Sequence, residues 1–175
     1  MRRLFVLGAL ALLLALPATS QADRPPQAGA QRPVDGCLVI SGGNGLVSIW
    51  ASGALIGRIE VSGTLTVEDL NPTDQSKPRV YGDDASIALS KTKTRYTGLN
   101  NLRFRFTGGG PYHVVVQGIG IDLSAVGRGR ALLDGSRYDQ TEGSYTADAD
   151  SLCASGIKPF PDTPTRVVLG TPTAG

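Results

Sequence analysis

His113 is the only histidine in this 175-residue chain, so every mechanism that needs an imidazole base depends on this residue. A serine or cysteine nucleophile also requires an acid that orients the base. The chain contains no Gly-x-Ser-x-Gly segment, and strand alternation places His113 on a solvent face beside arginines, with no evident carboxylate. We therefore expect His113 to be a solvated strand residue, and we assign no catalytic residue.

Carboxylate pairs are the other source of hydrolytic chemistry, because two acids in one cleft can divide the acid and base roles. The acids gather in three places: Asp83 and Asp84; Asp134, Asp139 and Glu142; and Asp148 and Asp150. The first two would point to opposite sides of an extended chain, and the others lie in turn-like sequence, where aspartate commonly bonds to the backbone. We expect turn roles. A small secreted hydrolase that uses paired carboxylates is the alternative function.

Metal-ligating residues are sparse. Two cysteines and one histidine fit no zinc-ligand spacing, and no segment matches an EF-hand loop. We therefore expect no metal site and no cofactor, with a calcium ion held by an oxygen-rich loop as the alternative.

Basic residues are the one surface feature that suggests binding. Lys91, Lys93 and Arg95 share one face of a predicted strand, and Arg103, Arg105 and His113 share another. The segment 91–105 contains five bases and no acid. If these strands are neighbours, the six side chains form a basic face that suits an anionic envelope polymer, an acidic glycan or a lipid head group. Solvation and protection of an edge strand are the alternative explanation.

The first 22 residues predict a signal peptide. Arg2 and Arg3 precede an apolar run over 4–16, and Ser20 and Ala22 supply small residues before a cleavage site. As a helix the run is about 20 Å long, which is short of the ~30 Å hydrocarbon layer. We expect a secreted or cell-envelope protein with no transmembrane segment after cleavage. Without Arg2 and Arg3, the 17 basic residues fall to 15 and equal the 15 acids, so a nucleic-acid partner is disfavoured.

Cys37 and Cys153 are the only cysteines. Because export places them in an oxidising compartment, we expect them to form an intramolecular disulfide. Unpaired thiols, or a cross-link to a partner, are the alternatives.

Glycine-punctuated apolar segments predict an all-β domain over 37–170, after a Pro/Gly linker at 23–36 and before a short tail at 171–175. Turn signals recur at Ser41-Gly42, Ser52-Gly53 and Ser62-Gly63, and no segment has a sustained helical period. We expect a single antiparallel β-sandwich, jelly-roll or immunoglobulin-like, of about eight to ten strands. A β-solenoid is the alternative, although the turn period stops after Leu70.

The segment 102–117 predicts a hairpin. Leu102, Phe104 and Phe106 alternate with arginines, three glycines follow, and residues 112–117 are rich in strand formers. The favoured register places Phe106 opposite Tyr112 and puts His113 beside Arg103 and Arg105. After Gln117 the apolar positions change parity to Ile119, Ile121 and Leu123, which predicts a bulge or bend at Gly118 or Gly120.

The run that contains GIDLSAVGRG and LDG resembles a recurrent signature in exported bacterial proteins without a known function, and the likeness extends back to GALIGRIEV, covering about residues 54–135. The resemblance implies a single exported all-β domain and no catalytic residue. We therefore expect a non-catalytic module that acts by binding an anionic polymer or another envelope protein, or by assembly into a homopolymer.

Overall fold

The computed structural model describes residues 34–74, 77–108, 110–138, 142–150 and 153–171, and these residues form strands and loops only. The predicted signal peptide, most of the linker and most of the tail lie outside the described residues. The strands are β1 (Gly36–Asp69), β2 (Arg79–Tyr81), β3 (Ala85–Ala88), β4 (Lys93–Gly98), β5 (Leu102–Phe106), β6 (Tyr112–Asp134), β7 (Ser144–Asp148), β8 (Lys158–Pro159) and β9 (Thr165–Leu169). Within the described ranges, no helix is long and apolar enough to cross a membrane.

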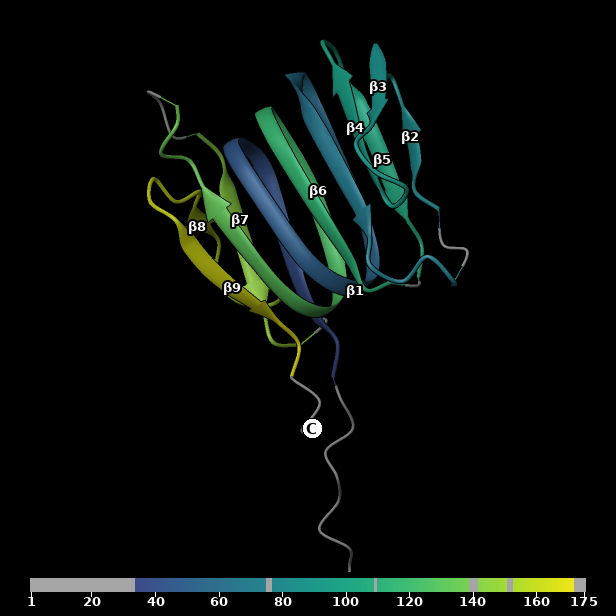
Figure 1. Cartoon of the computed structure of the whole chain (residues 1–175). Coiled ribbons are helices and arrows are strands. Elements are labelled where there is room, and N and C mark those ends of the chain that lie inside the picture. Colours follow the sequence, from purple (N-terminus) through teal and green to yellow (C-terminus); the bar gives the residue numbers. More distant parts are fainter. Residues whose placement is uncertain (1–33, 75–76, 109, 139–141, 151–152, 172–175) are drawn as a thin grey trace, which may run out of the picture. The chain divides into compact units, whose positions relative to one another are not determined.

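Two long strands, β1 and β6, form the centre of the domain and pair with each other repeatedly (Figure 1). Residues 112–118 of β6 lie between residues 46–51 and 62–69 of β1. Residues 121–127 of β6 lie between residues 36–43 and 53–59 of β1. Along its length, each long strand therefore passes from one of these two sets of paired segments to the other. The two sets are the two layers of the domain.

The layers are named here by their outward-facing residues. The His113 layer contains residues 46–51 and 62–69 of β1 and residues 112–118 and 129–134 of β6, with β3 and β4 at one side and β9 at the other. The Arg103 layer contains the remaining parts of β1 and β6, with β2 and β5 at one side and β7 and β8 at the other. All pairings are antiparallel.

The core lies between the layers, because alternate residues of each strand point inward. Val47, Leu65 and Val114 of the His113 layer and Leu55 and Phe104 of the Arg103 layer are at most 1% exposed and belong to one cluster. The predicted all-β, antiparallel, sandwich-like class is thus confirmed.

The predicted β5–β6 hairpin is wrong. β5 pairs with residues 55–59 of β1 and with β2, whereas residues 112–118 of β6 have β1 on both sides. The buried faces were predicted correctly, and the rings of Phe106 and Tyr112 lie with centroids 5.3 Å apart. The alternation of apolar and polar residues identifies the buried face of each strand. It does not show whether two strands pair side by side in a hairpin or face each other across the core.

The predicted change of parity in β6 is present and has a structural role. Gly118 and Gly120 are buried while Ile119 is 37% exposed, and from Ile121 onward the odd residues face the core. Ile119 had been expected among the inward positions, so its exposure corrects that detail. Gly120 has φ of +72°, which favours glycine, and the parity changes where β6 passes from the His113 layer to the Arg103 layer.

The predicted disulfide is confirmed. Cys37 in the first part of β1 bonds to Cys153 in the loop after β7, with Cα atoms 5.7 Å apart and a sequence separation of 116. The two ends of the domain also meet, since the amides of Val34 and Thr171 donate to Thr171 Oγ1 and the Val34 carbonyl respectively.

Candidate functional site

The structure does not bring the six predicted binding residues together. Lys93, Arg95 and His113 lie on the outer face of the His113 layer, whereas Arg103 and Arg105 lie on the outer face of the Arg103 layer. Lys91 is exposed in the turn between β3 and β4. The predicted single basic face is therefore two separate surfaces, because β4 and β5 pair with different parts of β1 and belong to different layers.

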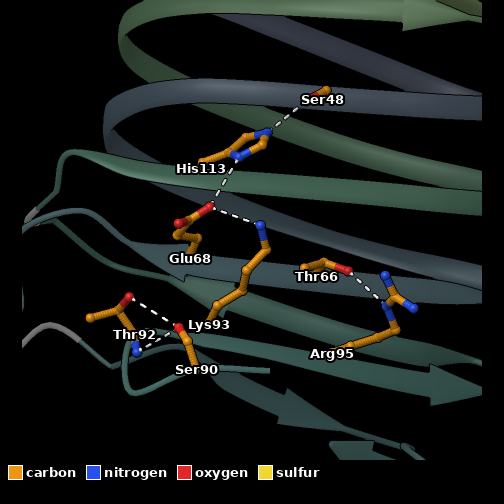
Figure 2. Close-up of polar contacts among 8 residues, drawn as sticks. All are labelled: Ser48, Thr66, Glu68, Ser90, Thr92, Lys93, Arg95 and His113. Atoms are coloured by element: carbon orange, nitrogen blue, oxygen red, sulfur yellow. Dashed lines mark hydrogen bonds and ion pairs between the residues drawn. The ribbon is translucent and has the colours of Figure 1, made fainter. Parts of the chain in front are cut away.

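On the His113 layer, polar side chains form a row across four strand segments (Figure 2). Lys93 Nζ lies 3.0 Å from Glu68 Oε2, which lies 3.5 Å from His113 Nδ1. His113 Nε2 lies 2.9 Å from Ser48 Oγ. In the next row, Arg95 Nε donates to Thr66 Oγ1 at 3.4 Å. His113 thus has an orienting carboxylate, contrary to the sequence-based prediction, and its neighbours are not Arg103 and Arg105.

The sequence signal for this row was weak, because Ser48, Glu68 and His113 are far apart in the chain. Only the pairing of β6 with two parts of β1 makes Glu68 and Trp50 cross-strand neighbours of His113. Knowledge of the register would have found the row, since it follows directly from which residues are opposite.

The order serine, histidine and glutamate is that of a hydrolytic triad, but the surroundings favour a structural row. The Ser48 residue is only 5% exposed. It lies within a strand segment paired on both sides, opposite Val115 and Leu132, so its backbone groups belong to the ladders. An acyl-transfer site requires amides that are available to a developing oxyanion. This row supplies a base and its orienting acid without such donors at Ser48.

The aromatic and electrostatic contacts of His113 also point to packing. Its ring stacks on Trp50 with centroids 4.2 Å apart and planes within 8°, and the Arg130 guanidinium lies 5.3 Å from the indole centroid. Burial lowers the pKa of His113, against the opposing effect of Glu68. The hydrogen bond from Lys93 holds the pKa of Glu68 below its usual value. At neutral pH the row therefore contains a neutral imidazole and an ionised carboxylate.

The outer face of the Arg103 layer carries an open groove with a volume of about 670 Å³. One cross-strand row of its floor runs from Arg105 through Ile56 and Ser124 to Val39. Ile56 is 54% exposed and Val39 is 39% exposed, so the floor presents apolar surface to solvent. At the side of the groove that β2 and β5 form, Tyr81 of β2 is the cross-strand partner of Arg103 of β5.

The charges around this groove are only partly compensated. Arg58 Nε donates to Asp122 Oδ2 at 2.8 Å, and Arg58 Nη2 lies 2.6 Å from Glu60 Oε1. The hydrogen bond that Arg58 donates to Asp122 raises the pKa of Arg58 above its usual value. Among the described residues, no carboxylate lies within ion-pair distance of Arg103 or Arg105. The groove therefore combines an apolar floor with two uncompensated guanidinium groups from one strand.

Residues 53–59 and 121–127 are direct antiparallel partners, and Arg58 is opposite Asp122. Sequence reasoning named Arg103 and Arg105 but missed Ile56, Val39 and Tyr81, because their isolated apolar character has no distinguishing pattern.

One aspartate from each acidic cluster accepts a hydrogen bond from a backbone amide. Asp84 Oδ2 accepts from the Leu99 amide at 2.6 Å, Asp134 Oδ1 from the Ser136 amide at 3.0 Å, and Asp148 Oδ2 from the Ser155 amide at 2.7 Å. The Asp134 bond, from an amide two residues further on, is the turn role expected from the sequence. Asp84 and Asp148 instead accept from amides 15 and 7 residues further along the chain, so these two carboxylates join separate segments. Asp139 lies outside the described residues. Within the described ranges, no group of three or more His, Cys, Asp or Glu side chains could hold a metal ion.

Comparison with protein-family models, curated proteins and solved structures finds no match for this chain.

Proposed function

We propose that this chain is an exported, non-catalytic binding module whose Arg103-layer groove holds an anionic amphiphile. The signal-like first 22 residues and the Cys37–Cys153 disulfide support the extracytoplasmic location, because such bonds form and persist in oxidising compartments. The observation that carries the binding proposal is the placement of Arg105 opposite the exposed side chain of Ile56, with Arg103 on the same face of β5.

The chemistry of the groove selects for two properties in one ligand. An acyl chain over Ile56 and Val39 would remove apolar surface from water, which contributes about 25 cal/mol per Å². A carboxylate or phosphate group would accept hydrogen bonds from Arg103 and Arg105, whose planar guanidinium groups suit bidentate contact with these anions. The groove volume of about 670 Å³ lies within the range of about 300–1,000 Å³ that is typical of small-molecule sites. Of the anionic envelope partners expected from the sequence, the groove therefore favours a lipid-like molecule.

Titration calorimetry of the mature domain with decanoate, below its micelle concentration, tests the proposal. Decyl phosphate, decanol and inorganic phosphate are the comparison ligands. We expect both anionic amphiphiles to bind, and we expect decanol and phosphate alone to bind at least tenfold more weakly, since a charge-assisted hydrogen bond contributes about 1.5–3 kcal/mol.

A matched pair of double variants locates the site. Arg103→Gln with Arg105→Gln should weaken decanoate binding by about tenfold or more, by the same hydrogen-bond argument. Lys93→Gln with Arg95→Gln makes the same change in net charge on the other layer and should leave binding within about twofold, because exposed charges contribute little at a distance. Equal weakening by both pairs, or no binding by the wild-type domain, would refute the proposal.

A further inference from the structure

β3 is an open edge of the His113 layer. Among the residues that the structure describes, it pairs only with β4, and all four of its own residues are exposed. Ile87 is 60% exposed and the adjacent Leu89 is 46% exposed. Natural edge strands commonly carry lysine or proline, which block pairing with another chain. The segment 85–90 contains neither, and it has no charged residue.

The hydrogen-bond phase of β3 determines which backbone groups face outward. The Leu89 amide donates to the Lys93 carbonyl at 2.8 Å, and the register places Ile87 opposite Arg95. Hydrogen-bonded and non-hydrogen-bonded pairs alternate along an antiparallel ladder. Leu89 and Ile87 therefore bond to β4, and the amides and carbonyls of Ser86 and Ala88 point away from the domain.

One acidic and one basic residue flank this edge, and a two-fold axis can bring the acid of each copy to the base of the other. Asp83 precedes β3 by two residues, and Lys91 lies in the turn that follows it. In an antiparallel pairing about Ile87, residues whose numbers lie equally far before and after Ile87 are brought together. Asp83 of each copy then approaches Lys91 of the other, and the two Ile87 side chains meet. Shifting the axis to either neighbouring residue loses both charge pairs.

We propose that two copies of this chain associate through antiparallel β3–β3 pairing about a two-fold axis at Ile87. Ser86 and Ala88 exchange four main-chain hydrogen bonds with Ala88 and Ser86 of the second copy. Ile87 of one molecule lies opposite Ile87 of the other in a non-hydrogen-bonded pair, where side chains approach closely. The paired strands extend the His113 layer across two molecules. The groove of the proposed function lies on the other layer, so this association is independent of it.

Charge reversal tests the pairing, with sedimentation equilibrium of the mature domain as the readout. Asp83→Lys and Lys91→Asp each create two like-charge pairs in a homodimer. We expect each variant to raise the dimer dissociation constant by about tenfold, because two exposed ion pairs are replaced by two repulsions. An equimolar mixture of the two variants should regain wild-type affinity, since a heterodimer contains two opposite-charge pairs. Asp162→Lys, which makes the same charge change in an exposed loop, should have no effect.

Further outcomes distinguish this association from others. Ala88→Pro removes an outward amide without removing a bond to β4, so it should give a folded monomer. A wild-type domain that stays monomeric at millimolar concentration would overturn the proposal. An association that ignores both charge reversals would also overturn it. Open-ended assembly would point instead to head-to-tail pairing of β3 with the opposite edge of the same layer.

Discussion

Gly53 of β1 and Gly127 of β6 are direct cross-strand partners at the place where both long strands pass between the two layers. A Cβ atom on Gly53 would lie 2.7 Å from the Cα of Gly127, and one on Gly127 would lie 2.9 Å from the Cα of Gly53. Both residues also have positive φ, of +142° and +158°. The backbones therefore approach more closely than any residue with a side chain allows, and this contact lets the two strands change layers together.

Gly127→Ala should consequently destabilise the domain by about 2–4 kcal/mol, because the new methyl group collides with backbone atoms that cannot move independently. Gly156→Ala is the matched control, since a Cβ atom at Gly156 meets nothing within 4 Å. Urea unfolding followed by circular dichroism measures both. If the two substitutions shift the midpoint equally, the close approach at Gly53 and Gly127 does not limit the fold.

The two faces of β5 should respond differently to substitution. Phe104 is 1% exposed and packs within the core, so Phe104→Ala should cost about 3–5 kcal/mol and Phe104→Arg should prevent folding. Arg103 lies on the outer face, so Arg103→Ala should change stability by less than about 0.5 kcal/mol and Arg103→Phe should be tolerated. Equal losses in thermal stability for the two positions would show that the assigned faces are incorrect.

His113 should make stability depend on pH between 7 and 5. Its pKa in the folded state is lowered by burial, so the unfolded chain takes up a proton first as the pH falls. The stabilisation is complete above the unfolded value of about 6.5 and is lost as pH falls through the folded pKa. His113→Gln should make the urea midpoint nearly independent of pH over this interval, because the chain has no second histidine. An unchanged slope in this variant would assign the dependence to other groups.

Glu68, Asp134 and Asp148 also have lowered pKa values in the folded state, so they too make the domain less stable as the pH falls, but at lower pH. Their stabilisation is present above the unfolded carboxyl values and is lost below about pH 5. The interval from pH 7 to 5 therefore isolates His113.

Reduction of the Cys37–Cys153 disulfide should lower stability substantially. The bond encloses a loop with a sequence separation of 116 residues, for which the chain-entropy model gives about 4–5 kcal/mol. Intact mass after alkylation should show no modified cysteine before reduction and two afterwards. Cys37→Ser with Cys153→Ser should reproduce the loss of stability. Two alkylated thiols in the unreduced protein would contradict the pairing.

The fold class, the burial of alternate residues and the cysteine pairing could all be predicted from the amino-acid sequence. Leu102, Phe104 and Phe106 had to share an inward face because the side-chain period of a strand is two, and exactly two cysteines leave one intramolecular pairing. The change of parity near Gly118 and Gly120 was also visible, because apolar residues switch position there.

Which strands are neighbours could not be predicted in this way and follows from the folded structure. Arg103 and His113 each point outward as expected, yet they lie on opposite layers, because β5 pairs with residues 55–59 of β1 while β6 pairs with residues 62–69. Glu68 reaches His113, and Ile56 reaches Arg105, through pairings between segments that are distant in the chain. Alternation encodes the direction of a side chain relative to its own strand, whereas the partner strand depends on how the whole chain encloses its core.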